Sequence, residues 1–70
     1  MNNENDLNEL IVLIQYLVNH NKSHNEELKE LALRVNSNNF KEAYFDIEEA
    51  IKIYDEANKK LEDALKRMQK

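Results

Sequence analysis

The sequence predicts an all-α antiparallel helical hairpin, and three observations lead to this fold class. The chain of 70 residues contains no glycine, no proline and no cysteine, the residues that most often form tight turns, break helices or staple small domains. Apolar residues recur at steps of three and four along both halves of the chain, as on one face of a helix. One short run of turn-forming residues, Asn36-Ser37-Asn38-Asn39, separates the halves. A loop this short makes the two helices antiparallel neighbours.

The first helix is expected over about residues 6–35 of a single domain that covers residues 1–70, with residues 1–5 disordered. Asp6 is a candidate N-cap, and Glu9 three residues later completes a capping box. The apolar register runs over residues 7–18 and resumes over residues 28–35. Carried through the gap, it places the missing core positions at Asn21 and His24.

The polar block over residues 19–25 also permits a different fold. Ser23 followed by Glu26 matches a capping box, and asparagine is a poor helix former. A break near residues 20–23 would give a three-helix bundle. The unbroken register and the lack of glycine or proline favour one continuous helix instead.

The second helix is expected over about residues 39–68, with Asn39 and Glu42 at its start. Its inner positions alternate in steps of four and three, as in a coiled coil, and they are Phe40, Tyr44, Ile47, Ile51, Tyr54, Asn58, Leu61, Leu65 and Met68. Alanine recurs every seven residues beside them, at Ala43, Ala50, Ala57 and Ala64. Small residues at this spacing allow two helices to approach closely.

Several large apolar residues lie off the inner face, and a lone hairpin would leave them in water. They are Val12, Leu13, Tyr16, Phe45 and Ile53. Pairing of two hairpins into a four-helix bundle would cover them, so we expect a homodimer with these residues in its interface. A role as a regulatory subunit that docks on a larger complex through the same residues is a further alternative.

His20 and His24 are the candidate functional residues, because their i,i+4 spacing puts both imidazoles on one helix face. Two histidines could hold a divalent Ni, Co or Zn ion if Glu27, Asp55, Glu56 or a second chain supplied the remaining ligands. The other interpretation is a structural polar layer of His20, Asn21, His24, Tyr54 and Asn58. In that layer Asn21 and Asn58 would hydrogen-bond between the helices and fix their register.

The composition weighs against several classes of function. The net charge is −4 and the basic residues are interspersed with acidic ones, which disfavours nucleic-acid binding. The apolar run over residues 10–18 is too short to span a bilayer, and the start lacks the positive segment of a signal peptide. A cytoplasmic protein is therefore expected. With no cysteine or threonine and only Ser23 and Ser37 as serines, enzyme activity is not expected.

The motif His20-Asn21-x-x-His24-x-x-Glu27-Leu28, followed by Glu56-Ala57-Asn58-x-x-Leu61-x-x-Ala64-Leu65, resembles a family of short uncharacterised prokaryotic proteins. These proteins are helical hairpins of methanogens and anaerobes, with His-Asn-x-x-His in the first helix and Glu-Ala-Asn in the second. The resemblance covers about residues 14–68. It implies that His20, Asn21, His24 and Asn58 form one motif and that the first helix is unbroken. Some relatives carry histidine-rich stretches that suggest nickel or cobalt handling, and this chain lacks them.

Together these observations predict a small non-enzymatic interaction or assembly protein with a central His/Asn layer. The alternative from a different class is a transition-metal-binding protein that uses His20 and His24. A homodimer is the expected assembly, and another protein is the alternative partner.

Overall fold

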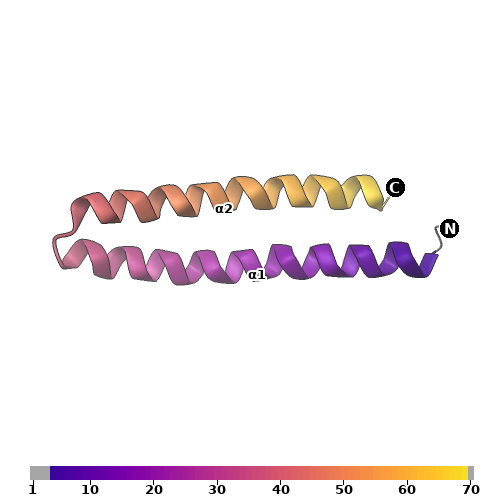
Figure 1. Cartoon of the computed structure of the whole chain (residues 1–70), viewed down its shortest axis with the longest axis horizontal. Coiled ribbons are helices and arrows are strands. Elements are labelled where there is room, and N and C mark those ends of the chain that lie inside the picture. Colours follow the sequence, from indigo (N-terminus) through magenta and orange to yellow (C-terminus); the bar gives the residue numbers. More distant parts are fainter. Residues whose placement is uncertain (1–3, 70) are drawn as a thin grey trace.

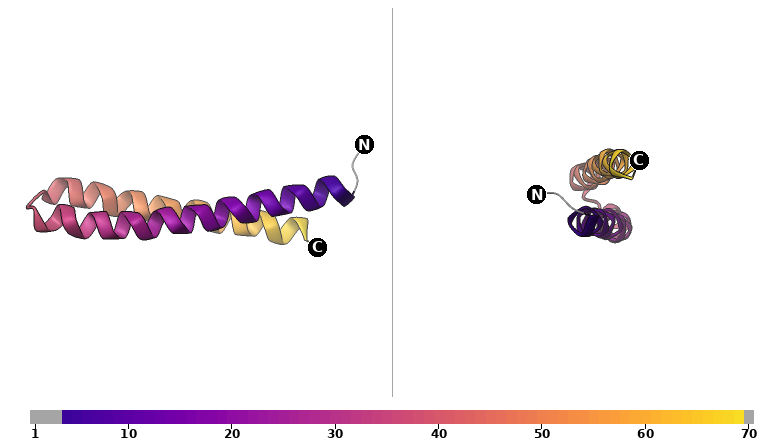
Figure 2. Two further views of the ribbon diagram at one scale, coloured as in Figure 1. Left: turned by 90° about the horizontal axis from the view of Figure 1, so that it is seen from below. Right: turned by 90° about the vertical axis from the view of Figure 1, so that its right-hand side faces the viewer.

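The computed structural model describes residues 4–69 as two long helices, α1 (Glu4–Ser37) and α2 (Lys41–Met68). The helices run antiparallel and lie side by side, with the start of α1 extending beyond the end of α2 (Figure 1). The molecule is a rod of 55 × 16 × 15 Å, and Figure 2 shows that its two helices cross at a shallow angle. The predicted all-α hairpin is therefore confirmed.

Helix α1 is continuous through the polar block, so the alternative fold with a break near residues 20–23 is wrong. The capping pattern of Ser23 and Glu26 is overridden because asparagines in the block point inward and bond to α2. Such contacts stabilise a helix more than the local preference of a residue weakens it.

The start of α1 also differs from the prediction. Glu4 and Asn5 are helical, so Asp6 lies inside the helix and is not its N-cap. Glu4 and Asp6 both lie in the first turn, where negative charge is favourable to the helix dipole. Residues 1–3, the rest of the segment expected to be disordered, lie outside the described residues.

The turn between the helices is shorter than the predicted loop of residues 36–39. Asn39 adopts a left-handed conformation with φ of 70°. The N–H of Phe40 donates to the carbonyl of Val35 at 3.3 Å, and the N–H of Asn39 donates to that of Asn36 at 3.0 Å. This is the Schellman pattern that ends a helix, with Asn39 in the place usually held by glycine.

Helix α2 therefore begins at Lys41, two residues later than expected, with Phe40 and not Asn39 at its N-cap position. Phe40 has no side chain that can accept a hydrogen bond, and no side-chain cap bond forms there. Asn39 is used to close α1 instead, because asparagine tolerates the left-handed conformation better than any other uncharged residue this chain has at the turn.

The core is a single line of contacts between the helices. The buried side chains are Val18, Asn25, Ala32, Ile51 and Asn58. Half-buried residues continue the same alternation of four and three in both directions, from Leu7 to Val35 in α1 and from Tyr44 to Met68 in α2. Two helices share only this narrow core, and no large side chain in it is fully buried.

Candidate functional site: buried amides and a histidine pair

Two buried asparagines link the helices in a symmetric way. The Asn25 side chain donates from Nδ2 to the carbonyl of Ile51 at 3.2 Å, and the Asn58 side chain donates to the carbonyl of Val18 at 3.2 Å. In each helix the asparagine and the accepting residue are one heptad apart. Because the helices are antiparallel, the two bonds are related by a local two-fold rotation about the middle of the hairpin.

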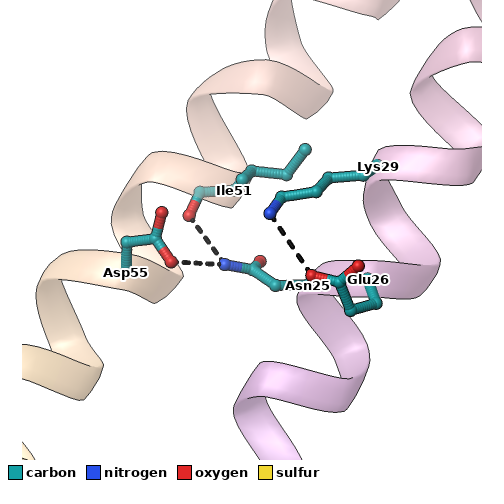
Figure 3. Close-up of polar contacts among 5 residues, drawn as sticks. All are labelled: Asn25, Glu26, Lys29, Ile51 and Asp55. Atoms are coloured by element: carbon teal, nitrogen blue, oxygen red, sulfur yellow. Dashed lines mark hydrogen bonds and ion pairs between the residues drawn. The ribbon is translucent and has the colours of Figure 1, made fainter.

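Each asparagine also contacts a second polar group. The Nδ2 of Asn21 donates to Oδ1 of Asn58 at 2.9 Å, which is the hydrogen bond expected between those residues. The Nδ2 of Asn25 donates to Oδ1 of Asp55 at 2.9 Å, as Figure 3 shows. The Oδ1 of Asn25 is buried and accepts no hydrogen bond from the described residues.

Asn25, and not His24, fills the core position beside Asn21, so the predicted inner position at His24 is wrong. Asn25 is buried, with 3% of the whole residue exposed, whereas His24 is half-buried and its side chain alone is 45% exposed. The alternation that holds elsewhere in α1 requires a step of four after Asn21, which reaches Asn25. The sequence carried this signal, but a step of three to a histidine fitted the general helical period equally well.

His20 and His24 form a chain of contacts on the surface of α1, at the edge of the core. Their Nε2 atoms lie 2.9 Å apart, and Nδ1 of His24 lies 3.1 Å from Oε1 of Glu27. The ring of Tyr16 stacks on His20 with 5.5 Å between centroids, and the ring of Tyr54 lies 6.5 Å from that of His24. Thus Tyr54 contacts His24, while Asn21 and Asn58 form a separate pair inside the core.

The order of donors along this chain follows from the carboxylate. Glu27 accepts hydrogen bonds when it is ionised, so Nδ1 of His24 is the donor. A neutral His24 then has its lone pair at Nε2, which accepts a hydrogen bond from the Nε2–H of His20. Glu27 therefore fixes both the ring orientation and the tautomer of His24.

The carboxylates proposed as metal ligands do not all gather around the histidines. Asp55 accepts a hydrogen bond from Asn25 at one edge of the interface, and Glu56 lines an open groove on α2 with Ile53 and Ala57. Within residues 4–69, no group of three or more histidine, aspartate or glutamate residues is arranged to hold a metal ion. Metal binding by one hairpin alone would rest on His20 and His24.

The two edges of the helical interface have different chemistry. At one edge Lys22 of α1 forms an ion pair with Glu62 of α2 at 3.4 Å, and Lys29 and Asp55 lie on the same edge. The opposite edge carries Leu10, Leu17, His24 and Leu31 of α1 beside the alanine stripe of α2. One edge is thus suited to water and the other is largely apolar.

The five residues predicted for the oligomer interface are all exposed, at 52–64%, but they do not share one side of the hairpin. Leu13 and Ile53 flank the apolar edge, and Tyr16 lies next to it through its stack on His20. Val12 is rotated about 100° around α1 from Leu13, and Phe45 is rotated about 100° around α2 from the side of Ile53, so both lie on the side of the charged edge. The sequence could not separate these sides, because that requires the relative rotation of the helices.

A family model described as a domain of unknown function (DUF8180) matches residues 10–68. Neither helix has an apolar segment of the length that a membrane span requires, as far as residues 4–69 show. No curated protein and no solved structure matches the chain. The family match covers most of α1 and all of α2, including both histidines and the buried asparagines. The chain therefore belongs to the DUF8180 family.

Proposed function

We propose that the protein is a non-enzymatic assembly module that pairs with a second copy of itself to form an antiparallel four-helix bundle. The observation that carries this proposal is one apolar face of exposed and half-buried residues, which extends to both sides of the middle of the hairpin. This apolar face consists of Leu10, Leu13, Leu17 and Leu31 of α1 and Ala43, Ala50, Ile53, Ala57 and Ala64 of α2, with His20 and His24 at its centre.

The accessible surface supports a partner for this face. The hairpin exposes 5914 Å², whereas a compact monomer of 8.4 kDa is expected to expose about 4,600 Å². The difference is comparable to the area that one subunit loses in an ordinary protein interface, about 800 Å² or more. Small domains without disulfides commonly gain their missing core by association.

The symmetry of the face supports a second copy as that partner. Leu13 and Leu31 lie equally far from the point midway between His20 and His24. On α2 the alanine stripe is centred beside Ile53, and the contact between His24 and Tyr54 supports a position of this centre within about one helical turn of the centre on α1. A two-fold axis through this level would place α1 against α1 and α2 against α2, each antiparallel, as a self-complementary interface requires.

The charges beside the face agree with this arrangement. Asp46 and Lys60 lie one heptad before and one heptad after Ile53 on the same side of α2. The proposed axis would bring Asp46 of one copy near Lys60 of the other, twice in each dimer. A parallel pairing would not bring these opposite charges together. Such exposed pairs add little affinity, but they favour one orientation.

The experiment that tests this proposal is sedimentation equilibrium of the untagged chain and of two matched leucine variants. The native chain is expected to have the mass of two chains at micromolar concentration. Leu13→Lys places a charge on the apolar face of both copies, and we expect dissociation to be at least about tenfold more favourable, because each buried leucine contributes about 1.5–3 kcal/mol. Leu33→Lys, which changes an exposed leucine on the other side of α1, should leave the mass unchanged.

A native mass of one chain across this concentration range would contradict the homodimer. In that case the apolar face would remain exposed, and docking on a different protein would become the better hypothesis. Equal effects of Leu13→Lys and Leu33→Lys would also contradict the proposed face.

A further inference from the structure

We infer that His20 and His24 are one half of a transition-metal site, which is completed by the same two histidines of a second copy at the two-fold axis. This inference rests on the homodimer proposed above. The ion it would take is one that prefers imidazole nitrogen, such as Zn²⁺ or Ni²⁺. Its function would be to lock the assembled bundle.

The first support is the position of the two ring nitrogens. The Nε2 atoms of His20 and His24 face each other at 2.9 Å. Two imidazoles on one tetrahedral Zn²⁺ have their ligand nitrogens about 3.3 Å apart, given Zn–N bonds of about 2.0–2.1 Å. An opening of about 0.4 Å, together with a rotation that turns both lone pairs away from each other and toward one ion, would allow both nitrogens to bind it. The proton that now lies between the two rings would move to Nδ1 of His20.

The second support is Glu27, which holds His24 as carboxylates hold the histidines of metal sites. Its Oε1 lies 3.1 Å from Nδ1 of His24, on the side of the ring away from His20. A carboxylate on Nδ1 orients the ring, keeps the proton off Nε2 and raises the basicity of the ligating nitrogen. The stack of Tyr16 on His20 restrains the orientation of the second ring.

The third support is that one chain cannot complete the site. No further histidine or carboxylate of residues 4–69 joins the pair as a third ligand, and a closed structural zinc site needs four. The pair lies at the centre of the apolar face, between leucines that would pack against the second copy. An antiparallel pairing of α1 with α1 about this level would therefore supply two more imidazoles to the same point.

The test uses the full untagged chain after dialysis against EDTA, titrated with Zn²⁺ and separately with Ni²⁺. Native mass spectrometry gives the number of ions per assembly, and thermal unfolding gives the stabilisation. We expect one ion per two chains and a saturable rise of the unfolding midpoint, because the ion binds only the folded assembly. Both should be lost in the double variant His20→Ala/His24→Ala. Circular dichroism of that variant is expected to show unchanged helix, since both rings lie at the surface.

Substitution of Glu27 distinguishes the proposed site from nonspecific metal binding by surface histidines, because nonspecific binding would not depend on this carboxylate. Glu27→Ala should weaken metal binding by about 10–100-fold, as is typical when a carboxylate behind a ligating histidine is removed. Glu30→Ala removes the same charge from the next turn and is the matched control, with no change expected. Equal affinities of these two variants would overturn the assigned role of Glu27.

The outcomes separate this inference from the proposed homodimer. A dimer without metal that binds no ion would overturn the shared site and leave the homodimer intact. One ion bound per single chain, or binding that persists without both histidines, would also overturn the shared site. A chain that is monomeric without metal and dimeric with one ion per two chains would support the site but show that the apolar face alone does not hold the dimer. A chain that is monomeric and binds no ion in any condition would contradict both.

Discussion

Asn25 is the residue at which stability and structural specificity conflict most clearly. The Nδ2 of Asn25 donates hydrogen bonds to the Ile51 carbonyl and to the Asp55 carboxylate. The Oδ1 of Asn25 is buried and accepts no hydrogen bond from the described residues. A buried acceptor without a partner costs about 1–3 kcal/mol. The amide nevertheless fixes one relative position of the helices, as polar residues do at inner positions of coiled coils.

Replacing Asn25 with leucine is therefore expected to stabilise the fold by about 1 kcal/mol or more. The carbonyl of Ile51 keeps its bond within α2, and Asp55 is exposed enough to bind water. The matched comparison is Asn58→Leu, where both ends of the amide have partners, so the gain should be smaller. Urea unfolding of both variants gives the free energies. A loss of stability in Asn25→Leu that exceeds the loss in Asn58→Leu would contradict the free-energy cost that we assign to the buried Oδ1 of Asn25.

Asn25→Asp should make stability depend on pH. A carboxylate at this buried position would lie beside the Asp55 carboxylate and the Ile51 carbonyl, and both burial and the like charge raise the pKa of such a group. The pKa is raised only in the folded state. The variant therefore loses stability as the pH rises above the pKa that this carboxyl has in the unfolded chain, and it regains stability at acidic pH. The expected deficit at neutral pH is about 3–5 kcal/mol.

The control for this pH effect is Asn21→Asp, the same change at a half-buried position that faces an amide and not a carboxylate. Thermal unfolding of both variants at neutral and acidic pH measures the difference. Equal deficits in the two variants across this range would show that Asn25 is not the more buried and more constrained amide.

The buried amides also show which parts of the site a sequence can predict. The bond between Asn21 and Asn58 followed from the register and the short loop, because both set which residues are level. The sequence pattern alone predicts His24 and not Asn25 in the core, since a helical period of 3.6 does not choose between steps of three and four. The choice is made by the partner helix, which presents the Ile51 carbonyl and Asp55 at that point.

At the scale of the elements, Asn39 is what ends α1 and turns the chain. The Schellman bonds of Phe40 and Asn39 require a left-handed residue at this position. A chain without glycine must use asparagine there, which has the same role at lower conformational cost than most other residues. The sequence indicates the turn correctly, but asparagine serves equally as an N-cap and as a left-handed cap, so the pattern alone predicts Asn39 at the start of the second helix and not at the end of the first.

Asn39→Gly is accordingly expected to keep or slightly raise stability, whereas Asn39→Ala should lower it by about 1 kcal/mol, because a Cβ is unfavourable at positive φ. Asn36→Ala serves as the control. Asn36 is an exposed helical residue, and there alanine should be neutral or favourable. Thermal unfolding of the three variants measures these differences in stability. If Asn39→Ala were as stable as Asn36→Ala, the left-handed turn would not be the element that closes the hairpin.

At the scale of the whole molecule, the hairpin is a rod with one charged edge and one apolar edge. The ion pair of Lys22 with Glu62 marks the first, and the leucines and alanines around His20 and His24 mark the second. The sequence predicted that two helices leave apolar residues uncovered. It could not assign them to sides, so Val12 and Phe45 were grouped with Leu13 and Ile53, although only the latter two flank the apolar edge.

The central claim is that this apolar edge pairs with itself about an axis beside Ile53. The natural chain has no cysteine, so single cysteines report contacts without interference. The most direct measurement compares Ile53→Cys with Phe45→Cys after treatment with a short bismaleimide cross-linker, read by the mass of the denatured product. Both positions are similarly exposed in the hairpin, at 59% and 64%. We predict efficient formation of a two-chain product for Ile53→Cys and little for Phe45→Cys. Efficient cross-linking at Phe45 and not at Ile53, or equal yields at both, would contradict the proposed assembly.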